Sequence, residues 1–100
     1  MEVVNTVGRR KAAIARVYLS EGDGKITINN KDVTVYFPSG ILQYVVKQPL
    51  NAINAADKFN IKAVLDGGGF KGQAEALRLA IARALVKVDA ENKPALKGEG

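Results

Sequence analysis

The stretch that decides the fold is LDGGGFKGQAEALRLAIARAL, residues 65–85. It follows an alternating run over 60–65 that predicts a strand, and it continues into a helix expected over 73–89. The helix has one apolar stripe that must face a core: Ala74, Leu77, Ile81, Ala84, Leu85 and Val88. Leu79 and Val86 lie between the charged groups of the opposite side, so that side is not simply solvated. The stretch therefore predicts a strand, a glycine turn and an amphipathic helix.

The residues before this stretch predict three more strands and another helix. The apolar, loosely alternating run over 3–20 indicates one strand with a bend at Gly8, and shorter strands are expected over 25–28 and 33–37. Ser39 is expected to cap a helix that ends near Pro49, because proline cannot continue it. The order is three strands, a helix, a strand and a helix. It predicts an α+β two-layer sandwich, with the helices on one face of a four-stranded mixed sheet. Residues 1–100 would form one domain, with 90–100 as the start of a C-terminal tail.

Composition limits the classes of function. The chain has no cysteine and no histidine, which excludes thiolate metal sites and removes the commonest general base and metal ligand. No apolar run is long enough for a membrane span, and residues 1–5 lack the features of a secretory signal. These features suit a cytoplasmic protein. The net charge of +5 favours a polyanionic partner, with nucleic acid first and an acidic membrane surface second.

The glycines of 67–72 match two known patterns. Gly67, Gly69 and Gly72 spell the G-x-G-x-x-G of dinucleotide-binding proteins, which also requires an acidic residue about 20 positions further on, at the end of a second strand. Asp89 has this spacing, but it ends a helix and only eleven residues follow it. We therefore expect no dinucleotide cofactor. A phosphate group remains a candidate ligand, because Lys71 lies inside the loop, and Gln73 and the start of a helix follow it. The alternative is a turn that needs glycine only for close packing.

A second basic motif lies near the N-terminus. Arg9, Arg10 and Lys11 are consecutive, and Arg16 continues the series. Like charges in succession repel one another, and a polyphosphate would relieve that repulsion. The alternative is a solvated strand end. If the strand over 60–65 lies beside the N-terminal strand, the two basic motifs would form one surface.

Several motifs in the same order resemble a known family. They are GRRKAAIARV over 8–17, GGG over 67–69 with GQA over 72–74, and AIARAL over 80–85. Together they are similar to small-subunit ribosomal protein nine, the universal S-nine family, in its bacterial form. The resemblance extends from about Asn5 to Gly98. Ala80 stands where many members have glycine, which favours the helix and can crowd a close contact.

The resemblance implies a left-handed crossover and a non-enzymatic, structural role in the head of the small ribosomal subunit. The implied partners are ribosomal RNA and neighbouring head proteins, with no membrane, cofactor, metal or small-molecule substrate. Members contact transfer RNA through a basic C-terminal tail. We expect this chain to lack that tail, so the contact is not carried over to any residue here. The candidate RNA-binding residues are Arg9, Arg10, Lys11, Arg16, Gly68, Gly69, Lys71, Gly72, Gln73, Arg78 and Arg83.

Two other functions fit parts of the sequence. The first is a single-stranded RNA module that clamps RNA with the G-x-x-G of residues 69–72, but such modules place this loop between two helices. The second is a small phosphotransfer enzyme, which would need a carboxylate to work with Asp66 near the loop. Neither requirement is met in the sequence.

Overall fold

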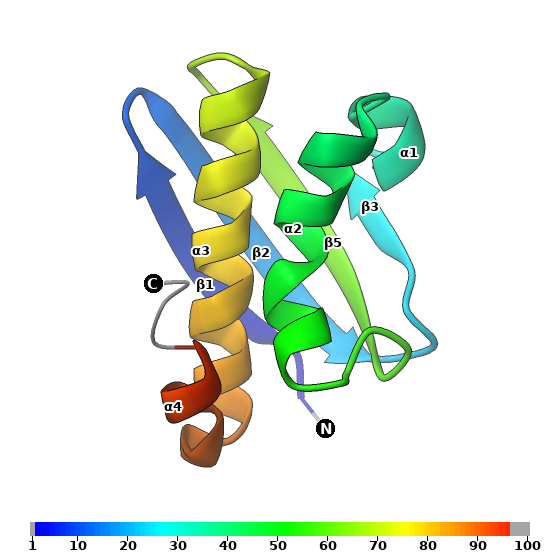
Figure 1. The fold of residues 1–100 in the computed structure, drawn as a ribbon, viewed down its shortest axis with the longest axis vertical. Helices are drawn as coiled ribbons and strands as arrows, with labels where there is room; N and C mark the ends of the chain where they lie inside the picture. Colours follow the sequence, from blue (N-terminus) through cyan, green and yellow to red (C-terminus); the bar gives the residue numbers. More distant parts are fainter. Residues whose placement is uncertain (1, 97–100) are drawn as a thin grey trace.

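In the computed structural model, which describes residues 2–96, a five-stranded sheet carries helices on one face (Figure 1). The strands are β1 (Val4–Arg10), β2 (Ala13–Glu21), β3 (Ile26–Ile28), β4 (Lys31–Asp32) and β5 (Phe59–Asp66). Their spatial order is β1-β2-β5-β3-β4, with β3 and β5 parallel and the other neighbours antiparallel. The helices are α1 (Val33–Tyr36), α2 (Gly40–Ala52), α3 (Phe70–Val88) and α4 (Lys93–Leu96), with a 3-10 helix, η1 (Ala90–Asn92).

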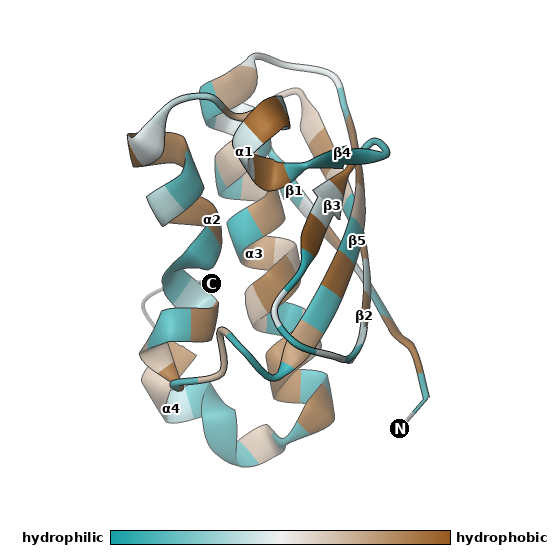
Figure 2. Ribbon diagram, turned by 90° about the vertical axis from the view of Figure 1, so that its right-hand side faces the viewer, coloured by the Kyte–Doolittle hydropathy of each residue, from teal (hydrophilic) through white to brown (hydrophobic). Residues whose placement is uncertain are grey.

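The two-layer α+β class is confirmed. Figure 2 shows the layers edge-on, with α2 and α3 on one side and the strands on the other. Alternate residues of β2 and β5 and the apolar stripe of α3 are buried between them: Ala13, Ala15, Val17, Leu19, Ile61, Ala63, Leu65, Ala74, Leu77, Ile81, Ala84 and Leu85. Val88, at the end of the stripe, is 36% exposed. The handedness of the crossover between β3 and β5 stays an implication of the resemblance. No described helix is both long enough and apolar enough to span a membrane.

The run over 3–20 is a hairpin, so the prediction of one bent strand was wrong. β1 and β2 pair from Val4 with Leu19 to Arg10 with Ala13, and the chain reverses at Lys11 and Ala12. The turn carries no glycine, asparagine or aspartate, the usual sequence signals of a tight hairpin. Lys11 nevertheless takes the left-handed conformation, with φ of 55°.

The segment over 33–37 was expected to be a strand, and it forms α1 instead. Asp32 caps this helix: its carboxylate accepts hydrogen bonds from the Thr34 N–H and hydroxyl, and these bonds lower the pKa of Asp32. A turn at Asn29 and Asn30, with φ of 49° and 67°, leads into the two-residue β4. The sheet therefore has five strands among the described residues, and the predicted count of four was wrong.

The helix α2 begins at the Ser39 cap as predicted, but it continues past Pro49 to Ala52. Pro49 and Leu50 are both buried. Their burial against the core offsets the backbone hydrogen bond that proline cannot donate inside a helix. The expected end of the helix near Pro49 was therefore wrong.

Small residues let β1 lie directly against α3. A Cβ added at Gly8 would be 2.2 Å from the Ala76 carbonyl oxygen and 2.7 Å from the Ala80 nitrogen. Thr6 lies two residues before Gly8 on the same face of β1, and its hydroxyl donates to the Ala80 carbonyl at 2.7 Å. The methyl group of Ala80 is fully buried here, and it fits because Gly8 opposite it has no side chain.

The segment that follows α3 is folded as far as the structure describes it. Within η1 and α4, the Asn92 side chain donates to the Leu85 carbonyl at 2.9 Å, and Leu96 is 3% exposed in the core cluster. The first part of the predicted tail thus packs on the domain. Residues 97–100 of that predicted tail lie outside the described residues.

A candidate RNA interface at the first hairpin and the glycine loop

The β1–β2 turn and the glycine loop lie side by side. Ile14 pairs with Asp66 where β2 meets β5, so the loop after Asp66 starts next to the turn. The backbones are in close contact, because a Cβ added at Gly67 would lie 2.3 Å from the Ala12 carbonyl oxygen. The two basic motifs, far apart in sequence, therefore meet at one end of the sheet. We call this surface the basic end: Arg9, Arg10, Lys11 and Lys71 with the glycines 67–69.

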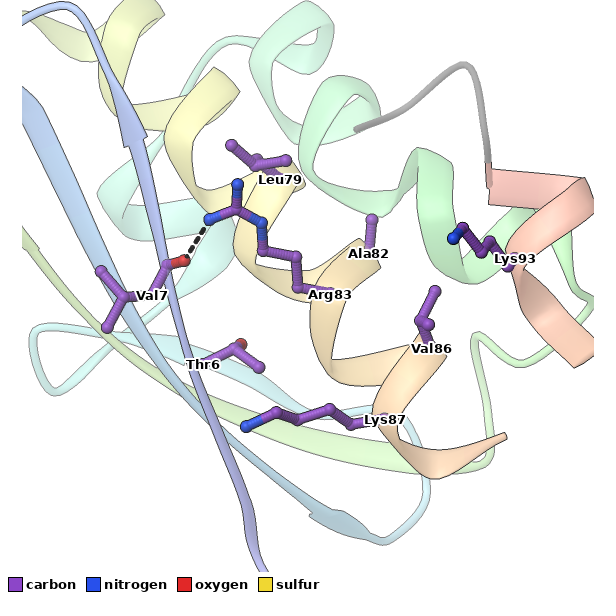
Figure 3. A pocket seen from close by; sticks show the side chains of 8 residues that line it. All are labelled: Thr6, Val7, Leu79, Ala82, Arg83, Val86, Lys87 and Lys93. Atoms are coloured by element: carbon purple, nitrogen blue, oxygen red, sulfur yellow. Dashed lines mark hydrogen bonds between the residues drawn. The ribbon is translucent and has the colours of Figure 1, made fainter. Parts of the chain in front are cut away.

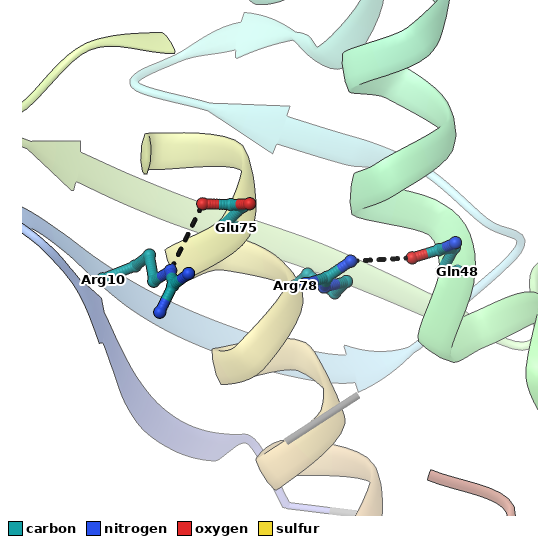
Figure 4. Close-up of polar contacts among 4 residues, drawn as sticks. All are labelled: Arg10, Gln48, Glu75 and Arg78. Carbon is teal, nitrogen blue, oxygen red and sulfur yellow. Dashed lines mark hydrogen bonds and ion pairs between the residues drawn. The ribbon is translucent and has the colours of Figure 1, made fainter. Parts of the chain in front are cut away.

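The cations of the basic end are exposed. Arg10 is partly neutralised, since its Nε lies 3.3 Å from Glu75 Oε1 on α3 (Figure 4). The Arg10 side chain is still 57% exposed, so the pair contributes little to stability. Arg9, Lys11 and Lys71 make no salt bridge to a carboxylate within residues 2–96. These three side chains are free to meet an external anion.

The glycine loop ends at a helix start without a side-chain cap. Gly67 and Gly68 have φ of 73° and 61°, and Gly69 is the cap residue of α3. The N–H groups of the first helical turn have no partner within the helix, and no side chain of Gly69 can accept from them. Such an end suits an anion. Gly72 lies inside α3 at an ordinary helical conformation, so it is not a strained position.

Gln73 has a structural role that the sequence did not reveal. It is 9% exposed, and its Oε1 accepts from the Tyr36 hydroxyl at 2.7 Å while its Nε2 donates to the Gly67 carbonyl at 3.0 Å. Asn29 joins the same network through Tyr36 and the Leu65 backbone. Gln73 therefore fixes the glycine loop, and its amide is turned inward rather than toward an RNA.

The sequence of this chain is similar to those of a known protein family. The family described as "Ribosomal protein S9/S16" matches residues 8–100. The chain belongs to this family. The protein named "Small ribosomal subunit protein uS9" of Bacteroides fragilis is 70% identical over 100 residues, which cover all of this chain and 78% of that protein. Proteins of the same name from Porphyromonas gingivalis and Azobacteroides pseudotrichonymphae are 64% and 57% identical over the same length.

The remaining candidate residues of this S9/S16 family member lie away from the basic end. Arg16 is exposed on the open face of the sheet, between Val7 and Val64 in the strand register. Arg78 Nη1 donates to Gln48 Oε1 at 3.0 Å, across the contact of α3 with α2 (Figure 4). Arg83 Nη1 donates to the Val7 carbonyl at 2.9 Å. Arg78 and Arg83 thus connect elements of the fold. Within residues 2–96, no three His, Cys, Asp or Glu side chains are grouped to hold a metal ion.

Proposed function

We propose that this protein is a structural constituent of the small ribosomal subunit and binds ribosomal RNA through its basic end. The family match over residues 8–100 and relatives named for the small subunit support the ribosomal role. One observation carries the choice of surface: the β2–β5 pairing brings Arg9 and Lys11 beside Lys71 and the uncapped start of α3. We place the protein in the cytoplasm, on the ribosome, in the subunit head beside other head proteins, and we expect no catalytic step or cofactor.

The chemistry of the basic end fits a phosphate backbone. RNA helices have a major groove too narrow for side chains to read, so a protein recognises them mainly by shape and phosphate. Arg9, Lys11 and Lys71 supply charge, while Gly68 and Gly69 let a phosphate approach the N–H groups of α3. Arg10 would join them if RNA displaces Glu75.

The open face of the sheet extends this surface in the proposal. Ile14 pairs with Asp66, the last residue of β5 before the loop, and Arg16 lies two residues further along β2. An RNA backbone that crosses the basic end can therefore reach Arg16 along β2. Arg78, Arg83 and Gln73 contribute by holding the fold in place, through the bonds described above.

The single-stranded RNA module is less well supported. Its clamp needs a loop between two helices, whereas β5 precedes this loop and Gly72 already belongs to α3. Phosphotransfer needs a second carboxylate beside Asp66. Within the described residues, no three His, Cys, Asp or Glu side chains are grouped there to hold a metal ion.

The salt dependence of RNA binding tests the proposal. The assay is a titration of the protein with a fragment of small-subunit ribosomal RNA from the head, at several salt concentrations. The double variant Arg9→Gln, Lys11→Gln should reduce the slope of log K against log salt by roughly 0.7–0.9 for each lost phosphate contact. Lys71→Gln should reduce the slope further, by the amount expected for about one lost phosphate contact. Melting temperatures should stay unchanged, because these side chains are exposed.

Lys25 and Lys31 provide the matched control. Lys25 precedes β3 at the end of the sheet far from the loop, and Lys31 lies in β4 at the opposite edge from β1. The variant Lys25→Gln, Lys31→Gln removes the same charge and should leave the slope nearly unchanged. If this control carries the salt dependence and the basic-end variants do not, the proposed surface is wrong.

A further inference from the structure

A second surface of the molecule is hollowed between β1 and the second half of α3 (Figure 3). The hollow, which we call the β1–α3 groove, has a volume of about 560 Å³. Its apolar lining includes Leu79, Ala82 and Val86, and Arg83, Lys87 and Lys93 stand around it. Leu79 and Val86 are the two apolar residues that interrupt the charged side of α3. A partner would explain why that side is not polar.

The groove is not built to accept an added strand. β1 is an edge strand, and such edges commonly pair with a strand from another chain. Here Arg83 donates to the Val7 carbonyl at 2.9 Å and Lys87 donates to the Asn5 carbonyl at 3.2 Å. These carbonyls are therefore already occupied. A partner would have to insert side chains into the groove instead.

The lining of the groove selects the class of partner. Among the described residues that line it, none is a carboxylate and none is aromatic. Arg83, Lys87 and Lys93 also make no salt bridge within residues 2–96. The three cations alone would suit a phosphate, but an RNA base would find no aromatic ring to stack on, and the apolar floor has no group that binds a phosphate. An apolar side chain with a carboxylate nearby would match both the floor and the charges.

We propose that the β1–α3 groove receives a segment of another protein of the small subunit. This segment carries one or two large apolar side chains within a few residues of an aspartate or glutamate. The apolar side chains lie over Leu79 and Val86, and the carboxylate meets Lys93 and its neighbouring cations. The volume of the groove lies within the range of sites that bury small ligands, which suits a few side chains rather than a domain. The inference rests on the proposed function only for where the partner is sought.

Photo-crosslinking in purified small subunits tests the proposal. The full-length protein carries p-benzoylphenylalanine in place of Val86, and a second preparation carries it in place of Ile41, which is 77% exposed on α2. We expect a ribonuclease-resistant adduct specific to position 86, whose mapped partner peptide has an apolar residue within about three positions of Asp or Glu. A ribonuclease-sensitive adduct, an adduct within this chain or to a second copy, a partner peptide without a carboxylate, or no adduct would overturn the proposal.

A charge reversal separates a fitted site from chance proximity. Lys93→Glu should lower the yield of the adduct about tenfold, and changing the mapped carboxylate to lysine should restore it. Lys93 makes no side-chain hydrogen bond to the rest of residues 2–96, so this variant should keep its melting temperature. Lys31→Glu is the control and should leave the yield unchanged. If this protein is absent from the purified subunits before irradiation, the proposed function is wrong. If it is present but gives no charge-dependent adduct, only the proposal for the β1–α3 groove is wrong.

Discussion

Replacing Gly8 with alanine should force β1 away from α3. The new Cβ would lie 2.2 Å from the Ala76 carbonyl oxygen and 2.7 Å from the Ala80 nitrogen, and real Cβ contacts essentially never fall below 3.0 Å. Both atoms belong to the helix backbone, so no side-chain rotation relieves the overlap. The strand or the helix must move by on the order of an ångström, which strains a close-packed interior.

The cost follows from two effects. Overpacking of this kind costs about 1–3 kcal/mol, and a displaced β1 also loses the buried bond from Thr6 to Ala80, which is worth another ~1–3 kcal/mol. Together they predict a loss of roughly 2–6 kcal/mol in the free energy of unfolding, or roughly 10–30 °C in melting temperature for a domain of this size. Thermal and urea melts followed by circular dichroism measure it.

Gly40→Ala is the matched control for this change. Gly40 lies in the first turn of α2, where an added Cβ meets nothing within 4 Å. Alanine there should leave the melting temperature unchanged or raise it slightly, because it is the better helix former. If Gly8→Ala and Gly40→Ala have the same melting temperature, the packing of β1 on α3 does not require glycine at position 8, and the packing explanation is refuted.

Periodicity in the sequence was enough to locate the main layers. The alternation in the segments that form β2 and β5 predicted strands, and the 3.6 period of α3 predicted a buried stripe. That stripe and alternate residues of the two strands form the core. The helix cap at Ser39 was also predicted from its residue type. These features depend on neighbours in the chain, which is why the sequence alone reveals them.

The errors occurred where distant contacts overrode local preference. Lys11 and Ala12 carry no turn signal, yet the pairing of β1 with β2 requires a reversal there. Residues 33–37 are rich in β-branched residues and indicated a strand. The structure instead buries Val33 and Phe37 in the core and caps a short helix with Asp32. Such choices depend on the assembled core and cannot be seen in a short segment.

The candidate site was visible in the sequence only as separate motifs. Arg9 to Lys11 and Lys71 were both identifiable as basic, but their adjacency depends on which strand lies beside β2. Gln73 was predicted to contact RNA because of its place after the glycines, and only its bonds to Tyr36 and to the Gly67 carbonyl show that it holds the loop. Residue type indicated the chemistry, whereas the direction of each side chain required the fold.

Two further changes separate charge from loop support at the basic end. Glu75→Gln removes the carboxylate beside Arg10. The free energy of unfolding should change by less than about 1 kcal/mol, because the pair is exposed. The salt dependence of RNA binding should become steeper by up to the amount for about one phosphate contact. A weaker affinity for RNA would contradict this expectation. Tyr36→Phe removes the hydroxyl that donates to Gln73 and leaves a buried amide oxygen without that partner, which costs about 1–3 kcal/mol. Because Gln73 also holds the Gly67 carbonyl, this loss should loosen the glycine loop and weaken RNA binding while all cations stay in place. Tyr44→Phe, on an exposed residue of α2, is the control. If Tyr36→Phe melts and binds RNA as Tyr44→Phe does, the buried amide network does not support the loop.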